Sequence, residues 1–124
     1  MVRETAERVQ EVASRVASAW PLYLAARRGF ASDAELARFL GVHRSQVARW
    51  KAGTPADPEN EERLRNLGTV VDGLTGYLDT ATIPDWLVGV NPHLGHRRPI
   101  DVALSGRVTE VLAAIEAEKR GAFA

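Results

Sequence analysis

Apolar residues recur at helical spacing along most of this chain, and no stretch shows the sustained alternation of a strand. The first such stretch predicts an amphipathic helix over residues 4–19. Trp20-Pro21 should end or kink this helix, because proline lacks a backbone N–H and disfavours helical geometry before it. Residues 22–25 continue an apolar helical pattern that Gly29 ends. The apolar positions of the first helix are Val9, Val12, Ala13, Val16 and Ala19.

Residues 32–53 predict two short helices joined by a tight turn. Ser32 and Glu35 have the S-x-x-E spacing of a capping box, in which each side chain bonds to the other residue's amide. Gly41 ends the first helix, since glycine tolerates left-handed geometry. The second helix runs over residues 44–51. The inward-facing positions of the two helices are Leu36, Ala37, Leu40, Val47 and Trp50.

Further helices are predicted over residues 59–79, 85–90, 101–104 and 108–119, with a break at residues 80–84. The longest has an apolar stripe formed by Leu64, Leu67, Val70, Val71, Leu74 and Leu78. Its glycines Gly68, Gly73 and Gly76 weaken the helix and allow close packing. Asn91 and Asp101 are expected to cap short helices, with Pro99 at a helix start and Trp86 in the core.

The composition favours a small protein without catalytic machinery. The chain has 124 residues, 45% hydrophobic positions and no cysteine, which suits one compact unit or two very small ones and excludes disulfides and cysteine-based zinc sites. No run reaches the length of a membrane span and the first residues hold no signal core, so we expect a cytoplasmic protein. His93 and His96 supply only two metal ligands, and neither a phosphate loop nor a nucleophile triad is present, so we expect no metal, cofactor or enzymatic activity.

Charge is unevenly distributed in a chain whose formal net charge is zero. Residues 27–53 hold six basic and two acidic side chains, whereas residues 54–82 hold two basic and six acidic ones. A basic segment within a neutral chain gives a local electrostatic footprint suited to nucleic acid. A solvated helix surface is the alternative interpretation.

The spacing of Leu36, Ala37, Leu40, Gly41 and Val42, followed by Val47, Trp50 and Gly53, resembles the helix–turn–helix of the Xre and phage-repressor families. In this docking geometry the second helix enters the major groove, and its N-terminal part contacts bases. Arg44 and Arg49 are expected to contact base edges, since a guanidinium pairs bidentately with guanine. The remaining expected DNA contacts, to bases or phosphates, come from His43, Ser45, Gln46 and Lys51, with Arg38 as a further backbone candidate. The alternative is a helix–turn–helix kept only for packing or dimerisation.

A second resemblance begins at Trp86. The pattern continues through Asn91, Leu94, Pro99, Asp101, Gly106 and Val111-Leu112 to Gly121-Ala122-Phe123-Ala124. It resembles the C-terminal toxin-binding domain of MbcA/ParS/Xre-type antitoxins over roughly residues 80–124, and residues 96–101 are especially close to the mycobacterial members. The resemblance implies a RES-domain toxin partner that destroys NAD. It also implies that the antitoxin covers the toxin's NAD pocket, with its C-terminal end close to the opening.

The residues of the C-terminal segment are compatible with that role. Lys119-Arg120, followed by small residues and one Phe, predict a short mobile tail that can enter a cleft, where Phe123 supplies an aromatic anchor. A frayed terminus is the alternative. The residues expected to contact the toxin are His96, Arg97, Lys119, Arg120, Gly121, Ala122, Phe123 and Ala124.

Together these features predict an all-α protein. Residues 1–79 form a helical region with a helix–turn–helix at 32–53, and residues 80–124 form a small helical toxin-binding domain. The expected function is that of a type II antitoxin that neutralises a RES-domain toxin and represses its own operon. We expect a homodimer, because helix–turn–helix proteins read paired half-sites, with the apolar faces of residues 4–26 and of the 59–79 helix as dimer surfaces. The alternative is a stand-alone Xre-like regulator without a toxin.

Overall fold

The computed structural model describes residues 18–122, so the helix predicted over residues 4–19 lies almost wholly outside the described residues. Within residues 18–122 the chain forms seven α-helices and two 3₁₀ helices and contains no strand, which confirms the predicted all-α class. In chain order they are α2 (Trp20–Arg27), α3 (Asp33–Leu40), α4 (Arg44–Lys51), α5 (Pro58–Leu74), η1 (Thr80–Thr82), α6 (Ile83–Val88), η2 (Pro92–Leu94), α7 (Pro99–Leu104) and α8 (Val108–Ala122).

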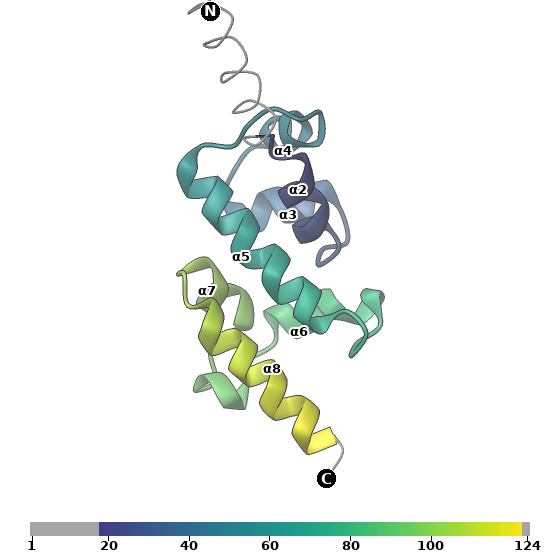
Figure 1. The fold of residues 1–124 in the computed structure, drawn as a ribbon, viewed down its shortest axis with the longest axis vertical. Helices are drawn as coiled ribbons and strands as arrows, with labels where there is room; N and C mark the ends of the chain where they lie inside the picture. The colour runs from purple at the N-terminus through teal and green to yellow at the C-terminus, as the bar shows by residue number, and fades with distance from the viewer. Residues whose placement is uncertain (1–17, 123–124) are drawn as a thin grey trace, which may run out of the picture.

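The long helix α5 runs through the middle of the molecule, with α2–α4 around its first half and α6–α8 around its second (Figure 1). It begins where Pro58 occupies the first turn and the Asp57 side chain accepts a hydrogen bond from the Asn60 amide. Its predicted apolar stripe is buried from Leu64 to Leu74. The buried side chains of both halves form one hydrophobic cluster, because this stripe faces both.

Gly68 of α5 lets α2 approach it closely, as predicted, whereas a Cβ at Gly73 would make only ordinary contacts with α8. A Cβ at Gly68 would lie 2.9 Å from the Cβ of Ala25 in α2, closer than side chains pack. A Cβ at Gly73 would lie 3.4 Å from Leu112 and 3.5 Å from Ile115 of α8. The two halves therefore pack on α5 at separate glycines.

The predicted helix over 59–79 ends too late by five residues. The structure ends α5 at Leu74, and Gly76 follows in a turn with φ 87°, which glycine adopts without strain. Leu78 lies in this turn and is half-buried, so it packs on the core without being helical.

The short helices of the second half also differ in detail from the prediction. Asn91 caps as predicted, with its side chain accepting from the His93 amide at 2.9 Å, but the helix it caps is the unpredicted η2. Pro99 starts α7 as predicted. The prediction that Asp101 caps a helix is wrong, because Arg98 holds the cap position and Asp101 lies in the first turn, where it pairs with Arg98 at 2.8 Å. No helix within residues 18–122 is long and apolar enough to span a bilayer.

Candidate nucleic-acid and toxin interfaces

The α3–turn–α4 pair is built as its local sequence predicts. Ser32 Oγ accepts from the Glu35 amide at 3.1 Å, although Glu35 makes no bond back to Ser32. Gly41 ends α3 in the left-handed region with φ 69°. His43 caps α4, and its Nδ1 accepts from the Ser45 amide at 3.1 Å. The turn therefore fixes α4 across α3 through backbone and cap bonds.

Trp50 holds α4 against the core, and the opposite face of α4 is left to solvent. Trp50 is 1% exposed and Val47 is fully buried, as predicted. The expected DNA contacts lie on the solvent side: Gln46 is half-buried, and the exposed residues are His43, Arg44, Ser45, Arg49 and Lys51. The structure thus brings all six onto one helix and its cap, which lie at one end of the described part of the chain (Figure 1).

A polar network centred on Asp33 links α2, α3 and α4. Its carboxylate accepts from the Tyr23 hydroxyl at 2.6 Å and from Arg27 Nε at 2.7 Å, and Lys51 Nζ lies 3.9 Å away. Partial burial would raise the pKa of Asp33, but the hydrogen bonds from Tyr23 and Arg27 and the charges of Arg27 and Lys51 together lower this pKa. Burial and the bond to Asp33 raise the pKa of Tyr23.

This network predicts an acid-sensitive contribution to stability. Because the folded pKa of Asp33 lies below its ordinary value of 3.8, its stabilisation is present above that value and is lost as pH falls through the folded pKa. Asp33→Asn should therefore lower the free energy of unfolding at pH 7, and the gap from wild type should shrink below about pH 4. Urea unfolding from pH 3 to 7 measures this gap. Asp79→Asn, at an exposed carboxylate, is the control, and a gap that does not change with pH would contradict the prediction.

Arg63 links α3 to α5, and this contact was not predicted from the sequence. Its Nη1 donates to the Leu40 carbonyl at 2.7 Å and to Asn60 Oδ1 at 3.1 Å. It therefore ties the end of α3 to α5 and satisfies a carbonyl left free at a helix end. Arg63 is one of two basic residues in an acidic stretch, and no local pattern predicts its partner.

On the other half of the molecule, His96 and Arg97 lie in the loop between η2 and α7. His96 is exposed and has φ 63°, an uncommon conformation for a side chain with a Cβ. Arg97 donates from Nε to the Leu94 carbonyl at 2.7 Å and pairs through Nη2 with Glu110 of α8. Both residues border an open hollow of about 330 Å³ that Arg98 and Ser105 also line. Arg97 thus ties the loop to α8, so part of its charge is already paired.

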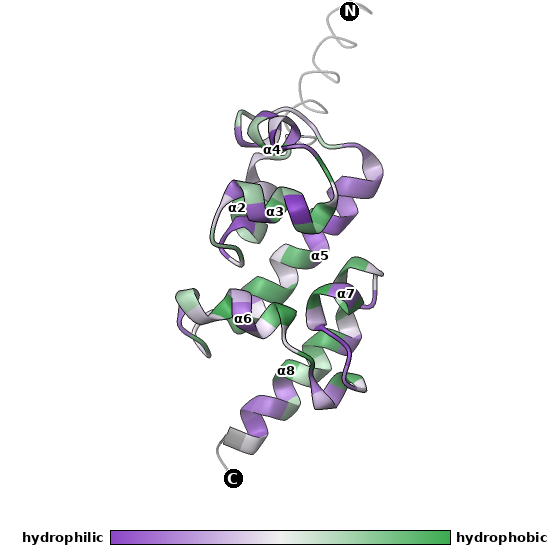
Figure 2. Ribbon diagram, turned by 180° about the vertical axis from the view of Figure 1, so that it is seen from behind, coloured by the Kyte–Doolittle hydropathy of each residue, from purple (hydrophilic) through white to green (hydrophobic). Residues whose placement is uncertain are grey.

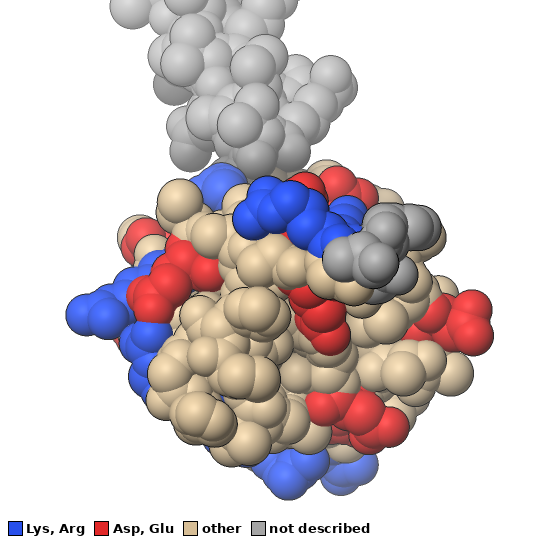
Figure 3. All heavy atoms as spheres, turned by 90° about the horizontal axis from the view of Figure 1, so that it is seen from below, with Lys and Arg blue, Asp and Glu red and all other residues tan. Residues whose placement is uncertain are grey.

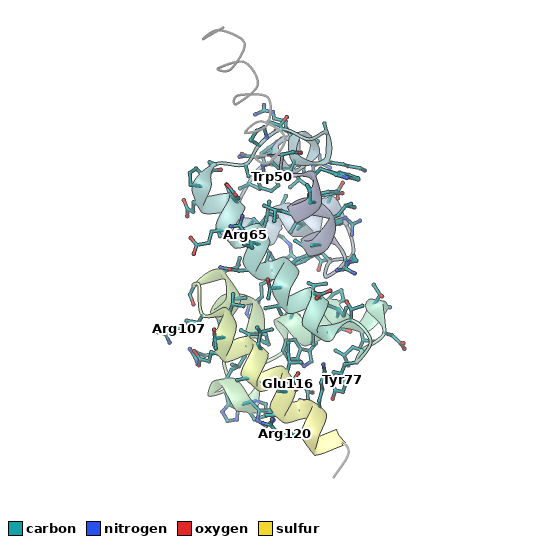
Figure 4. The ribbon with its side chains drawn as sticks, in the orientation of Figure 1. Trp50, Arg65, Tyr77, Arg107, Glu116 and Arg120 are labelled. Atoms are coloured by element: carbon teal, nitrogen blue, oxygen red, sulfur yellow. The ribbon has the colours of Figure 1, made fainter. Side chains whose placement is uncertain are left out.

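The expected tail is helical as far as it is described. Residues 119–122 continue α8, so the helix runs three residues beyond its predicted end at Lys119 and the expected tail begins as helix. Lys119 is half-buried, with Nζ 3.6 Å from Glu116. Arg120 and Gly121 are exposed, and Arg120 lies at the projecting end of α8 (Figure 4). Phe123 and Ala124 lie outside the described residues.

The expected toxin contacts fall into two separate groups. Arg97 pairs with Glu110 in the first turn of α8, and Arg120 follows ten residues later. At 1.5 Å per residue, this places the two groups about 15 Å apart along the helix. Figure 3 shows the end of the molecule at which α8 projects, where acidic and basic side chains surround a broad area without charged side chains.

Trp86 and Glu118 form a contact that the sequence analysis missed. The indole Nε1–H of Trp86 donates to Glu118 Oε2 at 2.7 Å and joins α6 to the last turns of α8. Trp86 is half-buried and packs against the hydrophobic cluster, so it borders the core rather than lying within it as predicted. Its helix position and aromatic character are visible in the sequence, but its partner 32 residues away is not.

Comparison with known proteins places this arrangement in a family. No family model matches the chain. The mycobacterial cidal antitoxins MbcA of Mycobacterium tuberculosis and Mycobacterium bovis are 37% identical to it over 78 residues, covering 62% of this chain and 69% of theirs. The fold matches a chain in the crystal structure of the M. tuberculosis MbcT–MbcA toxin–antitoxin complex with a TM-score of 0.70 and 31% identity, over 86% of this chain and 96% of that chain. The chain belongs to the MbcA family of antitoxins, proteins that are not enzymes.

Proposed function

We propose that this antitoxin neutralises a RES-domain, NAD-degrading toxin by covering its active site. The observation that carries the proposal is the match in sequence and fold to MbcA, which was crystallised in complex with the toxin MbcT. The resemblance over residues 80–124 supplies the toxin class and the mode of inhibition.

The end of α8 is the part of the described surface best suited to enter a cleft. Its last turns project beyond the end of α5, and they carry Lys119, Arg120 and Gly121 on a narrow element (Figure 1). We assign these residues, with Phe123 and Ala124, to the toxin's opening. His96 and Arg97, about 15 Å away along α8, contact the rim outside the pocket.

Co-expression of the antitoxin with the product of its neighbouring gene, the toxin in this proposal, tests this function. We expect the two proteins to purify together, the cells to grow and cellular NAD to stay at its normal level. Cells that make the toxin alone should lose NAD and stop growing. If the antitoxin purifies alone and NAD still falls, the proposal is wrong, and the stand-alone regulator becomes the better interpretation.

We also propose that α3 and α4 form a helix–turn–helix that binds operator DNA and represses the antitoxin's own operon. The support is the solvent-facing cationic side of α4, together with the cap and turn that fix α4 across α3. Arg44 and Arg49 contact base edges in this proposal. Lys51 and the capping His43 contact the phosphate backbone, and Ser45 and Gln46 add a base or phosphate contact.

Arg49→Ala should weaken operator binding by about 1–3 kcal/mol, because it removes a bidentate base contact. Fluorescence anisotropy with DNA from upstream of the antitoxin gene measures the change. Arg65→Ala is the matched control, since Arg65 is also exposed but lies on α5, paired with Glu61 at 2.9 Å (Figure 4). Equal affinities of the two variants would place Arg49 outside the groove.

We also propose a homodimer, but with a smaller contact surface than the apolar faces of residues 4–26 and of the 59–79 helix that the sequence analysis named. The apolar stripe of α5 is buried in the chain's own core and is not available to a second copy. On α2, however, Trp20 and Leu24 are 42% and 44% exposed and lie one helical turn apart. We assign the two-fold contact to this face of α2.

A further inference from the structure

The hydrophobic packing of α8 ends before the helix does. Val111, Ala114 and Ile115 are buried, and Ile115 is the last buried side chain of α8 for which burial is described. Ile115 packs beside Gly73, and α5 ends one residue later at Leu74. Seven more residues of α8 follow, and Figure 2 shows the change from apolar to polar colouring along them. The last two turns therefore have little apolar packing to hold them.

Two polar contacts reach these last turns from different elements. From α6, the Trp86 indole N–H donates to the Glu118 carboxylate at 2.7 Å. From the turn after α5, the Tyr77 ring lies 5.8 Å from Nζ of Lys119, within cation–π range. Glu118 and Lys119 are adjacent, so the two contacts hold the same turn of α8 from two directions. Figure 4 shows Tyr77 beside the lower half of α8 and Arg120 beyond it.

The turn that carries Tyr77 is itself well defined. The amides of Tyr77 and Leu78 both bond to the Leu74 carbonyl, at 3.1 and 2.9 Å. The half-buried Trp86 side chain packs against the hydrophobic cluster, and its indole N–H donates to Glu118. Both anchors thus belong to elements that are attached to the core or held by turn hydrogen bonds, whereas the end of α8 that they contact is the part at risk of fraying.

We propose that Trp86 and Tyr77 are positioning residues that fix the end of α8 in its toxin-binding direction before the toxin is met. This inference rests on the proposed function, in which Lys119, Arg120 and the residues after them enter the toxin's opening. A helix end that is already ordered loses less conformational freedom on binding, which strengthens affinity without any contact between Trp86 or Tyr77 and the toxin.

Hydrogen exchange on the antitoxin alone tests the anchoring. The amides of residues 119–121 bond one turn back within α8 and exchange when the end frays. Trp86→Phe and Glu118→Ala should each raise their exchange rates about tenfold, while α5 amides keep theirs. Glu118→Gln, which keeps an acceptor oxygen, should exchange like wild type. Tyr77→Leu should raise the rates and Tyr77→Phe, which keeps the ring, should not.

Toxin affinity tests the consequence. Trp86→Phe and Glu118→Ala should each weaken binding of the co-expressed toxin by roughly three- to tenfold, and the double variant should be no worse than either single one. If hydrogen exchange of the α5 amides accelerated as much as that of residues 119–121, the variants would be globally destabilised, and the inference would be overturned. A loss of affinity in Glu118→Ala but not in Trp86→Phe would also overturn it, because Glu118 would then contact the toxin directly.

The two proposals fail in different ways. If wild-type protein binds the toxin and all variants bind equally well, the positioning role is wrong and the proposed function stands. If wild-type protein does not bind the toxin, the proposed function is wrong and this inference falls with it, whatever the exchange rates of α8.

Discussion

Removal of residues 119–124 is expected to leave the antitoxin folded and to abolish most of its protection against the toxin. The fold should persist because the buried residues of α8 end at Ile115 and the deletion keeps Glu118, the partner of Trp86. Affinity should fall by about 100-fold or more, since the deletion removes the residues that we place inside the toxin's opening and such central contacts dominate binding energies. Growth and NAD levels of cells that co-express the toxin measure the protection.

Circular dichroism separates this result from simple unfolding. The truncated protein should keep its helical signal and melt within a few degrees of wild type. A shorter deletion of residues 123–124 distinguishes the described end of α8 from the two residues after it. Full protection by the longer deletion would show that another surface, such as the loop of His96 and Arg97, inhibits the toxin.

Trp50→Ala is expected to be the most destabilising single substitution among those considered, with a loss of about 3–5 kcal/mol in the free energy of unfolding. Trp50 is 1% exposed and is the largest fully buried side chain in the described part of the chain. Its removal leaves a cavity between α4 and the core. The cationic face of α4 would then lose its fixed orientation, so DNA binding should fall with stability.

Trp20→Ala, compared at protein concentrations low enough to keep both variants monomeric, is the matched control, because it deletes the same side chain at a position that is 42% exposed and that we place in the dimer contact rather than in the core. It should cost less than about 1 kcal/mol, including its stacking on Tyr23. Urea unfolding of both variants by tryptophan fluorescence and circular dichroism gives the comparison. Similar losses for the two would mean that α4 does not depend on Trp50 for its attachment.

The sequence predicted the α3–turn–α4 pair well because its determinants are local. The Ser32 cap, the left-handed Gly41 and the apolar pair Val47 and Trp50 each act within a few residues, so their spacing alone specifies the turn. The stripe of α5 was equally clear, because a long helix repeats its pattern over several turns. The six expected DNA contacts therefore lie on α4 and its cap, all of them exposed except the half-buried Gln46, although their role is still a prediction.

The C-terminal half was harder to predict because its determinants are distant in sequence. The bonds from Trp86 to Glu118 and from Arg97 to Glu110 join residues far apart in the chain, and no periodic pattern reveals them. The small residues near the terminus gave no periodic pattern, so the prediction ended the last helix at Lys119, three residues before the end of α8. The predicted end of the 59–79 helix was wrong for a local reason, because the apolar stripe continues to Leu78 although the chain turns at Gly76, just after α5 ends at Leu74.

The proximity of Lys51 to Asp33 affects how the affinity for a duplex would respond to ionic strength. A basic side chain that meets a phosphate releases a condensed counterion, and the number released sets the slope of affinity against salt. With a carboxylate 3.9 Å away, Lys51 brings its own counter-charge to the duplex. Binding of α4 to DNA would therefore displace fewer counterions than the number of basic residues on α4 predicts. Discrimination between the operator and other DNA sequences would depend more on the base contacts of Arg44 and Arg49 than on the total charge of the helix.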